Sequence, residues 1–198
     1  MDSLKLWVTL VTILLSVAPP FALSQTYPSR PVRLIVGFAP GGNVDVPARI
    51  VAAKLGELWG TPVVVENRPG AGGSMGANVA AKAPADGYTL VVCNSASHGV
   101  NPSFYKKLAY DAVKDFTAIA MIGTSPNVLL VHPSSQTKTV NAFIAYAKAN
   151  PGKISIASAG VGTTQHLSME LFKSMTGTDI VHVPYKGGAP ALADLIGG

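Results

Sequence analysis

The chain has 198 residues, with 15 basic and 10 acidic side chains and a formal net charge of +5. The basic residues are scattered, with Lys106-Lys107 as the only adjacent pair, which excludes the clustered cationic stripe of a nucleic-acid-binding surface. The single cysteine, Cys93, excludes a disulfide within the chain and a cysteine-based metal site. Cys93 sits in an apolar strand pattern, and we expect it to be buried in the core.

The first 24 residues have the pattern of a secretory signal peptide. Lys5 provides a basic start, and an apolar run over residues 6–17 follows it. This run is shorter than the roughly 20 residues that cross a bilayer. We therefore predict cleavage between Ser24 and Gln25 and export of the mature protein. A retained anchor is the alternative, because Asp2 weakens the basic region.

The mature chain opens with a strand, a glycine turn and a helix. Residues 32–36 are apolar and β-branched, which predicts a buried strand. The turn Pro40-Gly41-Gly42 leads into a helix with Val51, Leu55 and Leu58 on one face. Backbone N–H groups at such a helix start favour an anion. The turn is therefore either an anion-binding corner or an ordinary connection between a strand and a helix.

Two further strands are predicted in the same unit. Residues 63–65 form the first, followed by the glycine-rich loop 66–73 and a helix over 74–82. Residues 88–93 form the second, followed by the polar run 94–98. In a parallel sheet with helical crossovers the loops after these strands share one edge, where open α/β proteins bind ligands.

A second unit repeats this arrangement. The predicted strands are residues 116–122, 128–131, 154–157 and 180–183, with a helix over 140–147. The loop 158–166 contains two glycines and leads into a helix with Thr163 or Thr164 as N-cap. Leu167, Leu171 and Met175 lie on one face of this helix, and Met169, Phe172 and Met175 are expected to face the core. A last helix follows the turn 184–188. Two such units predict two lobes that close around a small solute.

These motifs together resemble the periplasmic solute-binding proteins of tripartite tricarboxylate transporters, the Bug family. The resemblance runs in the family's order from about Tyr27 to Gly198. The matching runs are Pro40-Gly41-Gly42 with Asp45 and Ala48-Arg49, Glu66 to Gly73, Asp86 to Leu90, Lys114-Asp115-Phe116, Gly160 to Leu167, and His182 to Gly188. The glutamate-to-glycine run and the run that begins at His182 are specific, whereas the Pro-Gly-Gly turn is common.

The resemblance implies an α/β, two-lobed fold of the type II periplasmic-binding-protein kind, with lobe 1 over residues 25–123 and a partial lobe 2 over 124–198. It implies a periplasmic, non-enzymatic monomer without a cofactor, which captures a carboxylate-containing small molecule and presents it to membrane permease subunits. Carried over by position, the carboxylate contacts are Phe38, Pro40, Gly41, Gly42 and Asp45 on lobe 1, and Gly162, Thr163, Thr164 and His166 on lobe 2. Asn94 and Ser95 are further candidates from the third loop.

The sequence departs from the family's pattern in two ways. Val44, Val46 and Pro47 stand where the family often has small or hydroxylated residues. Pro47 cannot donate a hydrogen bond, so the helix start is expected to shift towards Asp45 as N-cap. Family members also continue beyond the position of Gly198 with a segment that returns to lobe 1. We therefore expect a fold that is incomplete at the C-terminus, with exposed apolar faces.

Several candidate side chains have two interpretations. Asp45 either caps its helix or also orients a bound water or ligand. Arg49, one turn further on, either neutralises ligand charge or pairs with Asp45, and we favour the pair. Lys186 either attracts the ligand or is a solvated turn residue. His166 either touches the ligand or is structural.

An enzyme is the rival interpretation. The run around Ser74 fits the Gly-x-Ser-x-Gly nucleophile elbow of serine hydrolases, but no strand leads directly into Ser74. Asp179 and His182 sit on one short strand, where they are poorly placed as catalytic partners. The loop at Gly160 lacks the third glycine of a dinucleotide site, and the four histidines lack metal-ligand spacing. A solute-binding sensor accessory fits the sequence as well as a transport receptor does.

Overall fold

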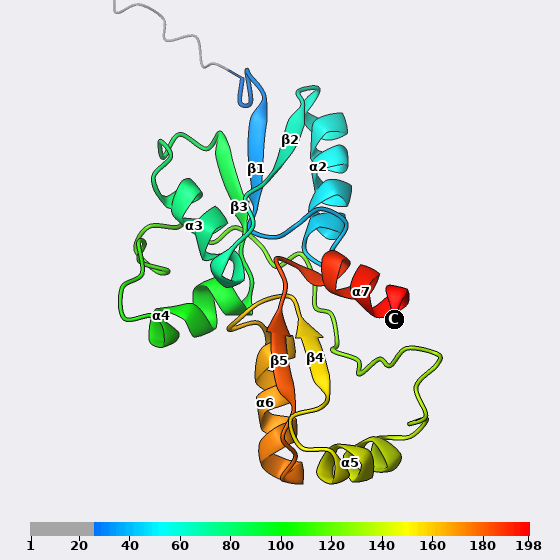
Figure 1. The fold of residues 1–198 in the computed structure, drawn as a ribbon. Helices are drawn as coiled ribbons and strands as arrows, with labels where there is room; N and C mark the ends of the chain where they lie inside the picture. The colour runs from blue at the N-terminus through cyan, green and yellow to red at the C-terminus, as the bar shows by residue number, and fades with distance from the viewer. Residues whose placement is uncertain (1–25) are drawn as a thin grey trace, which may run out of the picture.

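The computed structural model describes residues 26–198, so the predicted signal peptide and its cleavage site lie outside the described residues. Within them, a three-stranded parallel sheet has the order β2-β1-β3, and a second parallel sheet pairs β4 with β5. Figure 1 shows the two sheets in two bodies, lobe 1 above and lobe 2 below. The elements are β1 (Val32–Val36), α2 (Asp45–Trp59), β2 (Val63–Asn67), the 3-10 turn η1 (Ala71–Gly73), α3 (Ser74–Ala81), β3 (Thr89–Val92), the π-turn η2 (Ser95–Val100), α4 (Asn101–Phe104), α5 (Val140–Ala149), β4 (Ser155–Ser158), α6 (Thr164–Thr176), β5 (Val181–Pro184) and α7 (Gly188–Gly197).

Lobe 1 is a parallel sheet with helices on both of its faces. The central strand β1 is buried except for Arg33, as its apolar composition predicts. Leu34 and Val36 point to one face, where they form a core with the small residues of α2. Ile35 points to the opposite face, against α3. The strand therefore alternates its side chains between two helices, and both crossover connections return the chain in parallel.

Main-chain atoms make the closest approach between the end of β1 and α3. A Cβ atom placed on Gly37 would lie 2.6 Å from the carbonyl oxygen of Gly73. A Cβ atom on Gly76 would lie 2.7 Å from the Cα of Gly37. Since real Cβ atoms do not approach other atoms this closely, all three positions depend on the missing side chain. The end of β1 and the start of α3 are thereby packed at main-chain distance.

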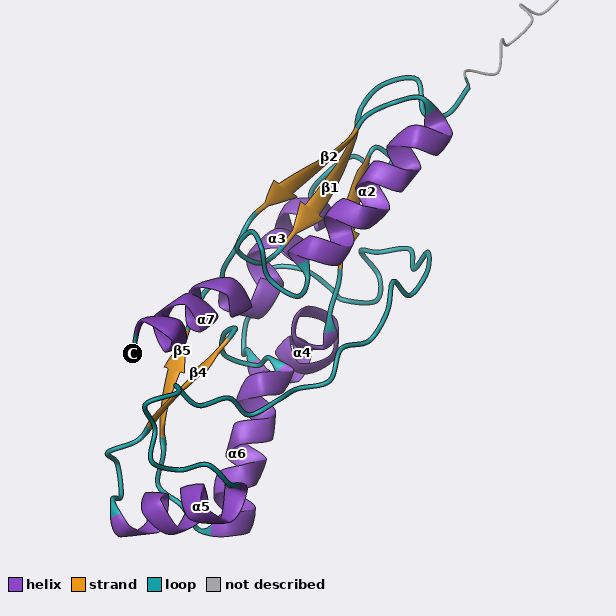
Figure 2. Cartoon of the chain, turned by 90° about the vertical axis from the view of Figure 1, so that its right-hand side faces the viewer, coloured by secondary structure: helices purple, strands orange, loops and turns teal. Residues whose placement is uncertain are grey.

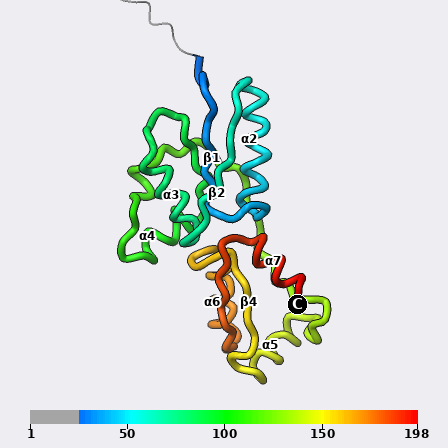
Figure 3. The backbone as a smooth tube through the Cα atoms, turned by 45° about the horizontal axis from the view of Figure 1, so that its top comes forward, coloured from blue at the N-terminus to red at the C-terminus, as the bar shows by residue number. Residues whose placement is uncertain are grey.

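Lobe 2 has a small core of its own. Phe143 and Ala147 of α5 pack with Ile180, which precedes β5, and α6 contributes Phe172. Thr163 is the N-cap of α6, as predicted, because its side chain accepts from the backbone N–H of His166. The last helix, α7, starts where the two lobes meet and runs along the side of lobe 2, as the views in Figures 1 and 3 agree.

The structure corrects three expectations. The segments 116–122 and 128–131 are not strands but lack regular structure, with Ile119 79% exposed, because no strand among the described residues lies beside them to complete a ladder. Cys93 is exposed rather than buried. On α6, Met169 is buried but Met175 is 78% exposed, because lobe 2 covers only one side of that helix. The expected exposed apolar faces are thus present.

Among the described residues, no helix combines the length and the apolar character needed to cross a membrane.

Candidate functional site

The site lies where the two lobes meet. The strands of both sheets end at this seam, and the loops that follow them face one another (Figures 1 and 2). A partly open cavity of about 190 Å³ lies between these loops. Its lining residues are Phe38, Gly70, Ala71, Gly72, Gly73 and Tyr105 from lobe 1, and Ala159, Gly160, Val161, Pro184, Tyr185 and Lys186 from lobe 2. Both lobes therefore contribute to a single binding space.

A larger hollow of about 380 Å³ lies inside lobe 2. It is bordered by α5, β4 and residues 129–137, and its lining includes Phe143 and Ile154. This hollow sits beside the segment that was predicted to be a strand and is not one, so it is a gap in the packing of lobe 2. No loop of lobe 1 borders it, and for that reason we place the candidate site at the seam.

The lobes touch through their main chains. The backbone N–H of Ala39 donates to the carbonyl oxygen of Lys186 across the seam, at 2.9 Å. A Cβ atom on Gly72 would lie 2.5 Å from the carbonyl oxygen of Val161. One on Gly162 would lie 2.6 Å from Oδ1 of Asn101. The glycines in these loops let the backbones of the two lobes approach closely beside the cavity.

In the first loop, which follows β1 and contains the turn Pro40-Gly41-Gly42, Phe38 is the one predicted site residue that lines the cavity. Its ring is buried and packs beside Gly73. Pro40 and Gly41 are exposed and lie outside the lining. Gly42 is buried beside the start of α7. The Pro-Gly-Gly turn thus lies outside the lining, and Phe38, two residues before Pro40, forms this part of the cavity wall.

Asp45 is the anchor of that first loop. Its carboxylate is 1% exposed and accepts from the N–H of Gly41 at 2.8 Å and from Nε of Arg49 at 2.8 Å. Nδ2 of Asn67 donates both to Asp45, at 2.7 Å, and to the carbonyl oxygen of Phe38, at 2.9 Å. The predicted pair of Asp45 with Arg49 is confirmed. The N-cap of α2, however, is Val44, because the Asp45 side chain turns back to Gly41 instead of capping.

These contacts set the charge of Asp45. Burial acts to raise the pKa of this carboxyl, but the hydrogen bonds from Arg49, Gly41 and Asn67 outweigh it and hold the pKa below its ordinary value. Asp45 is therefore a carboxylate near neutral pH, and its negative charge is neutralised by Arg49. It does not line the cavity, so its role is to shape the loop that does.

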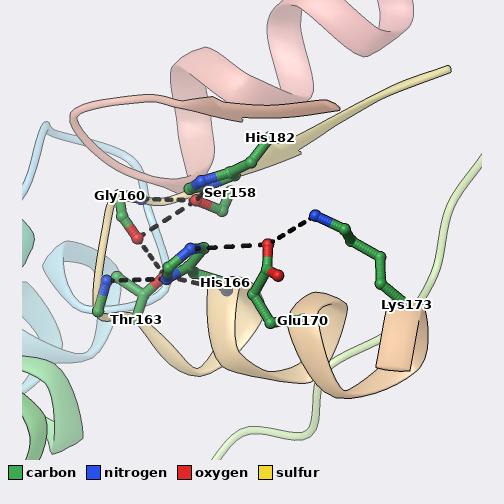
Figure 4. Close-up of polar contacts among 8 residues, drawn as sticks. Ser158, Gly160, Thr163, His166, Glu170, Lys173 and His182 are labelled. Atoms are coloured by element: carbon green, nitrogen blue, oxygen red, sulfur yellow. Dashed lines mark hydrogen bonds and ion pairs between the residues drawn. The ribbon is translucent and has the colours of Figure 1, made fainter. Parts of the chain in front are cut away.

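The second loop is the segment between β4 and α6, and most of its hydrogen bonds are to its own residues and to the flanking ends of these elements (Figure 4). Oγ of Ser158 accepts from the N–H of Gly160 at 3.1 Å, and Oγ1 of Thr163 donates to the carbonyl oxygen of Gly160 at 2.7 Å. Nδ1 of His166 accepts from the N–H of Gly162 at 3.2 Å. Gly162, Thr163 and His166 are therefore outside the cavity lining and hold in place its neighbouring wall, Val161.

Three other predicted residues also lie outside the lining. Oγ1 of Thr164 donates to Oδ1 of Asn127 at 3.3 Å. The side chain of Asn94 accepts from the N–H of Ser97 at 2.9 Å and caps the turn η2. Ser95 is exposed at the start of that turn. The roles of these residues toward a ligand stay predictions.

The sequence analysis missed most of the lining. The glycine run 70–73 and the turn 184–188 were noted as motifs, but they were not proposed as site residues. Their signal was present, because a run of glycines after a strand marks close approach to another backbone or to a ligand. Tyr105 carried no local signal, since it lies in an irregular segment after α4. Its position depends on how the chain leaves lobe 1.

The geometry gives no support to hydrolase chemistry at Ser74. Its hydroxyl is buried, accepts from Nδ2 of Asn101 at 2.7 Å and lies 3.2 Å from the hydroxyl of Tyr110. Neither partner is a general base of the kind that activates serine. In the described part of the chain, no group of three histidine, cysteine or acidic side chains is placed to hold a metal ion.

Comparison with known proteins then identifies the family. The profile of the tripartite tricarboxylate transporter family receptors, TctC, matches residues 47–198. The chain belongs to this receptor family. BugT of Bordetella pertussis is 43% identical over 176 residues, which are 88% of this chain and 54% of BugT. The members it resembles are solute-binding proteins rather than enzymes.

Solved structures of TctC relatives share the fold. Rpa4515 from R. palustris, solved with adipate, has a TM-score of 0.83 and 43% identity, over 85% of this chain and 56% of Rpa4515. MatC from Rhodopseudomonas palustris, solved with bound malate, has a TM-score of 0.79 and 35% identity, over 85% of this chain and 57% of MatC. The α/β periplasmic-binding-protein fold is thus confirmed. The TctC chain described here spans about half the length of the relatives it matches.

Proposed function

We propose that this TctC-family chain is a periplasmic solute receptor that holds a small dicarboxylate in the seam cavity and delivers it to the permease subunits of a tripartite transporter. The observation that carries the proposal is the cavity lined by glycine loops of both lobes. At about 190 Å³ it is below the 300–1,000 Å³ that is usual for drug-sized ligands, so it suits a short acid.

The charge and polarity of the lining support an anion. Of the described residues that line the cavity, Lys186 carries the only charge, and it is exposed at the rim. No carboxylate among these described lining residues competes for Lys186, so its charge can attract and orient an acid group of the solute. This attraction is several kcal/mol weaker at the exposed rim than it would be in a dry interior. The hydroxyl of Tyr185 donates to Asp194, which leaves its ring for the cavity wall. Phe38 and Tyr105 add two further aromatic side chains from lobe 1.

The relatives supply the chemical class of the ligand. Adipate and malate, named with Rpa4515 and MatC, are both short dicarboxylates. They differ in length and in the hydroxyl group of malate. We therefore assign the dicarboxylate class to the ligand of this chain. We also propose that the protein is a monomer in solution and that it reaches the periplasm with cleavage after Ser24. Size-exclusion chromatography with light scattering and N-terminal sequencing of the exported protein test these two assignments.

The binding test is a thermal-shift and calorimetric screen of the purified chain. Adipate, malate and succinate are compared with adipamide, which keeps the length of adipate but has no charge. A fitting dicarboxylate at a hundredfold excess over its Kd stabilises the fold by about 2.7 kcal/mol, whereas adipamide leaves the melting temperature unchanged. Lys186→Met weakens the binding of the acid and not the stability of the free protein. A folded chain that responds to none of the three acids refutes the proposal.

A further inference from the structure

Two histidines form a stacked pair directly behind the second loop of the site. The rings of His166 on α6 and His182 on β5 are 4.2 Å apart and nearly parallel, at 22°. Nε2 of His182 lies 2.6 Å from Oγ of Ser158 at the end of β4. The labelled side chains in Figure 4 show His166 and His182 between the loop and the α6 side chains. Three elements therefore converge on this pair.

His166 holds the loop by accepting a hydrogen bond. Its Nδ1 accepts from the backbone N–H of Gly162 at 3.2 Å, so Nδ1 carries no proton and the ring is neutral. A protonated ring has N–H groups at both nitrogens and cannot accept. Two donors would then face each other at Gly162, and the bond would be lost. The neighbouring residue Val161 lines the cavity, so the loop cannot shift at Gly162 without changing the wall.

The charged groups around the pair are few. On α6, Oε1 of Glu170 lies 4.0 Å from Nε2 of His166 and also accepts from Nζ of Lys173 at 3.1 Å. Because Lys173 already compensates Glu170, little negative charge is left to stabilise an imidazolium. On β4 the facing group is the neutral hydroxyl of Ser158, and on β5 it is His182. Two rings 4.2 Å apart do not both take up a proton without mutual repulsion.

The direction of the shift at His182 agrees with this geometry. Burial comes first among the causes that lower the pKa of His182; a proton on His166 would act in the same direction, as the charge of Lys173 does, and Glu170 opposes them. His182 is therefore neutral at pH 7, and the stack is uncharged where the loop is in place.

We propose that His166 is a positioning residue whose protonation releases Gly162 and loosens the cavity wall at Val161, so that acid weakens the grip on the solute. The loop geometry carries this inference for the free protein, and only its effect on the solute rests on the proposed function. If one proton is linked to binding, affinity falls by at most about tenfold for each pH unit toward acid.

The first test needs no ligand. The amide signal of Gly162 is followed by NMR in the free protein from about pH 7.5 to about pH 5, across the histidine range. The proposal expects the signal to titrate and the protection of this amide, measured against its intrinsic exchange rate at each pH, to fall at the acid end. In His166→Asn, the amide oxygen stands in the place of Nδ1 and accepts without titrating, so the Gly162 signal stays constant. His132→Asn, in a segment away from the loop, keeps the wild-type titration.

The outcome is decided by which variant loses the titration. If Gly162 does not respond to pH in the wild type, or responds equally in His166→Asn, the proposal is overturned. His182→Gln guards against a misfolded His166→Asn, because its amide nitrogen and oxygen can replace Nε2 beside Ser158. The titration of Gly162 persists in His182→Gln if His166 is the responsible group. If the titration of Gly162 is lost in His182→Gln but retained in His166→Asn, His182 is the responsible group and the inference is refuted.

The second test measures the affinity for adipate at the same pH values. Wild type loses affinity toward acid more steeply than His166→Asn, and the ratio of the two cancels the titration of adipate itself. Equal slopes in both proteins overturn the link to the solute. If adipate does not bind either protein at pH 7.5, the proposed function fails for this ligand, while the amide titration still decides the role of His166.

Discussion

Replacing Asp45 by alanine tests whether the first loop depends on a buried carboxylate. The substitution removes the acceptor shared by Gly41, Arg49 and Asn67. Hydrogen bonds to a charged group contribute about 1.5–3 kcal/mol each when both partners are shielded. Arg49 is 51% exposed and Gly41 is exposed, so water replaces part of what they lose. We therefore expect a net loss of about 2–3 kcal/mol in the free energy of unfolding.

Urea unfolding measures this loss. With a slope of about 2 kcal/mol/M, the midpoint of Asp45→Ala falls by about 1 M. The matched control is Asp86→Ala, because Asp86 also accepts from an arginine, Arg30, at 2.8 Å, but both side chains are exposed. A surface pair contributes less than about 1 kcal/mol. Equal midpoints for the two variants would refute the reasoning that burial makes Asp45 the anchor.

The pH dependence of the free energy of unfolding provides a further test of Asp45, because the direction of its pKa shift fixes the direction of the change. The pKa of Asp45 is lower in the folded state than in the unfolded state, so its contribution is present above the unfolded value of about 3.9. It is lost as the pH falls further through the folded value. The stability advantage of the wild type over Asp45→Asn is therefore constant near pH 7 and shrinks below about pH 4. An advantage that is the same at pH 3 contradicts the assignment.

Two further substitutions test the seam and the helix start. Gly72→Ala places a Cβ atom 2.5 Å from the carbonyl oxygen of Val161 at a φ of 60°, so we expect a loss of roughly tenfold or more in dicarboxylate affinity by calorimetry. Gly177→Ala, with a φ of 64° and nothing within 4 Å, should lower stability only; equal affinities would contradict the close approach. Thr163→Ala removes the N-cap of α6 and lowers the free energy of unfolding by about 1 kcal/mol, while Thr163→Ser retains it. Identical melting curves for the alanine and serine variants would count against the cap.

Local patterns in the sequence predicted what is decided locally. The apolar, β-branched run 32–36 became the central strand, and the glycine before Thr163 marked the start of a capped helix. These features depend on residues within one turn or one strand of each other. The same holds for the pair of Asp45 with Arg49, which are one helical turn apart.

Features that depend on distant partners were predicted less well. The runs 116–122 and 128–131 have strand composition, but a strand also needs a neighbouring strand for its hydrogen bonds. The apolar stripe of α6 had two possible buried sides, and only the one with Met169 meets the sheet. The side chain of Asp45 found Asn67, which is 22 residues away, instead of capping its own helix. In each case the deciding contact lies outside the local pattern.

The candidate site shows the same division. The glycine loops were found from their composition, but which loops meet across the seam depends on how the two lobes are placed. Phe38 was predicted and lines the cavity, whereas Tyr105 and Tyr185 were not predicted and do so. His166 was proposed as a ligand contact and lies behind the wall, bonded to the loop.

The main-chain contact between β1 and α3 limits how this pocket can diverge. A Cβ atom on Gly37 would meet Gly73, one on Gly76 would meet Gly37, and one on Gly73 would meet the ring of Phe38, so none of the three glycines can gain a side chain while its neighbour stays in place. A larger residue there would push α3 outward and carry the attached glycine wall with it. Variation in the lining is thereby left to positions such as Tyr105 and Tyr185, which take no part in this main-chain contact.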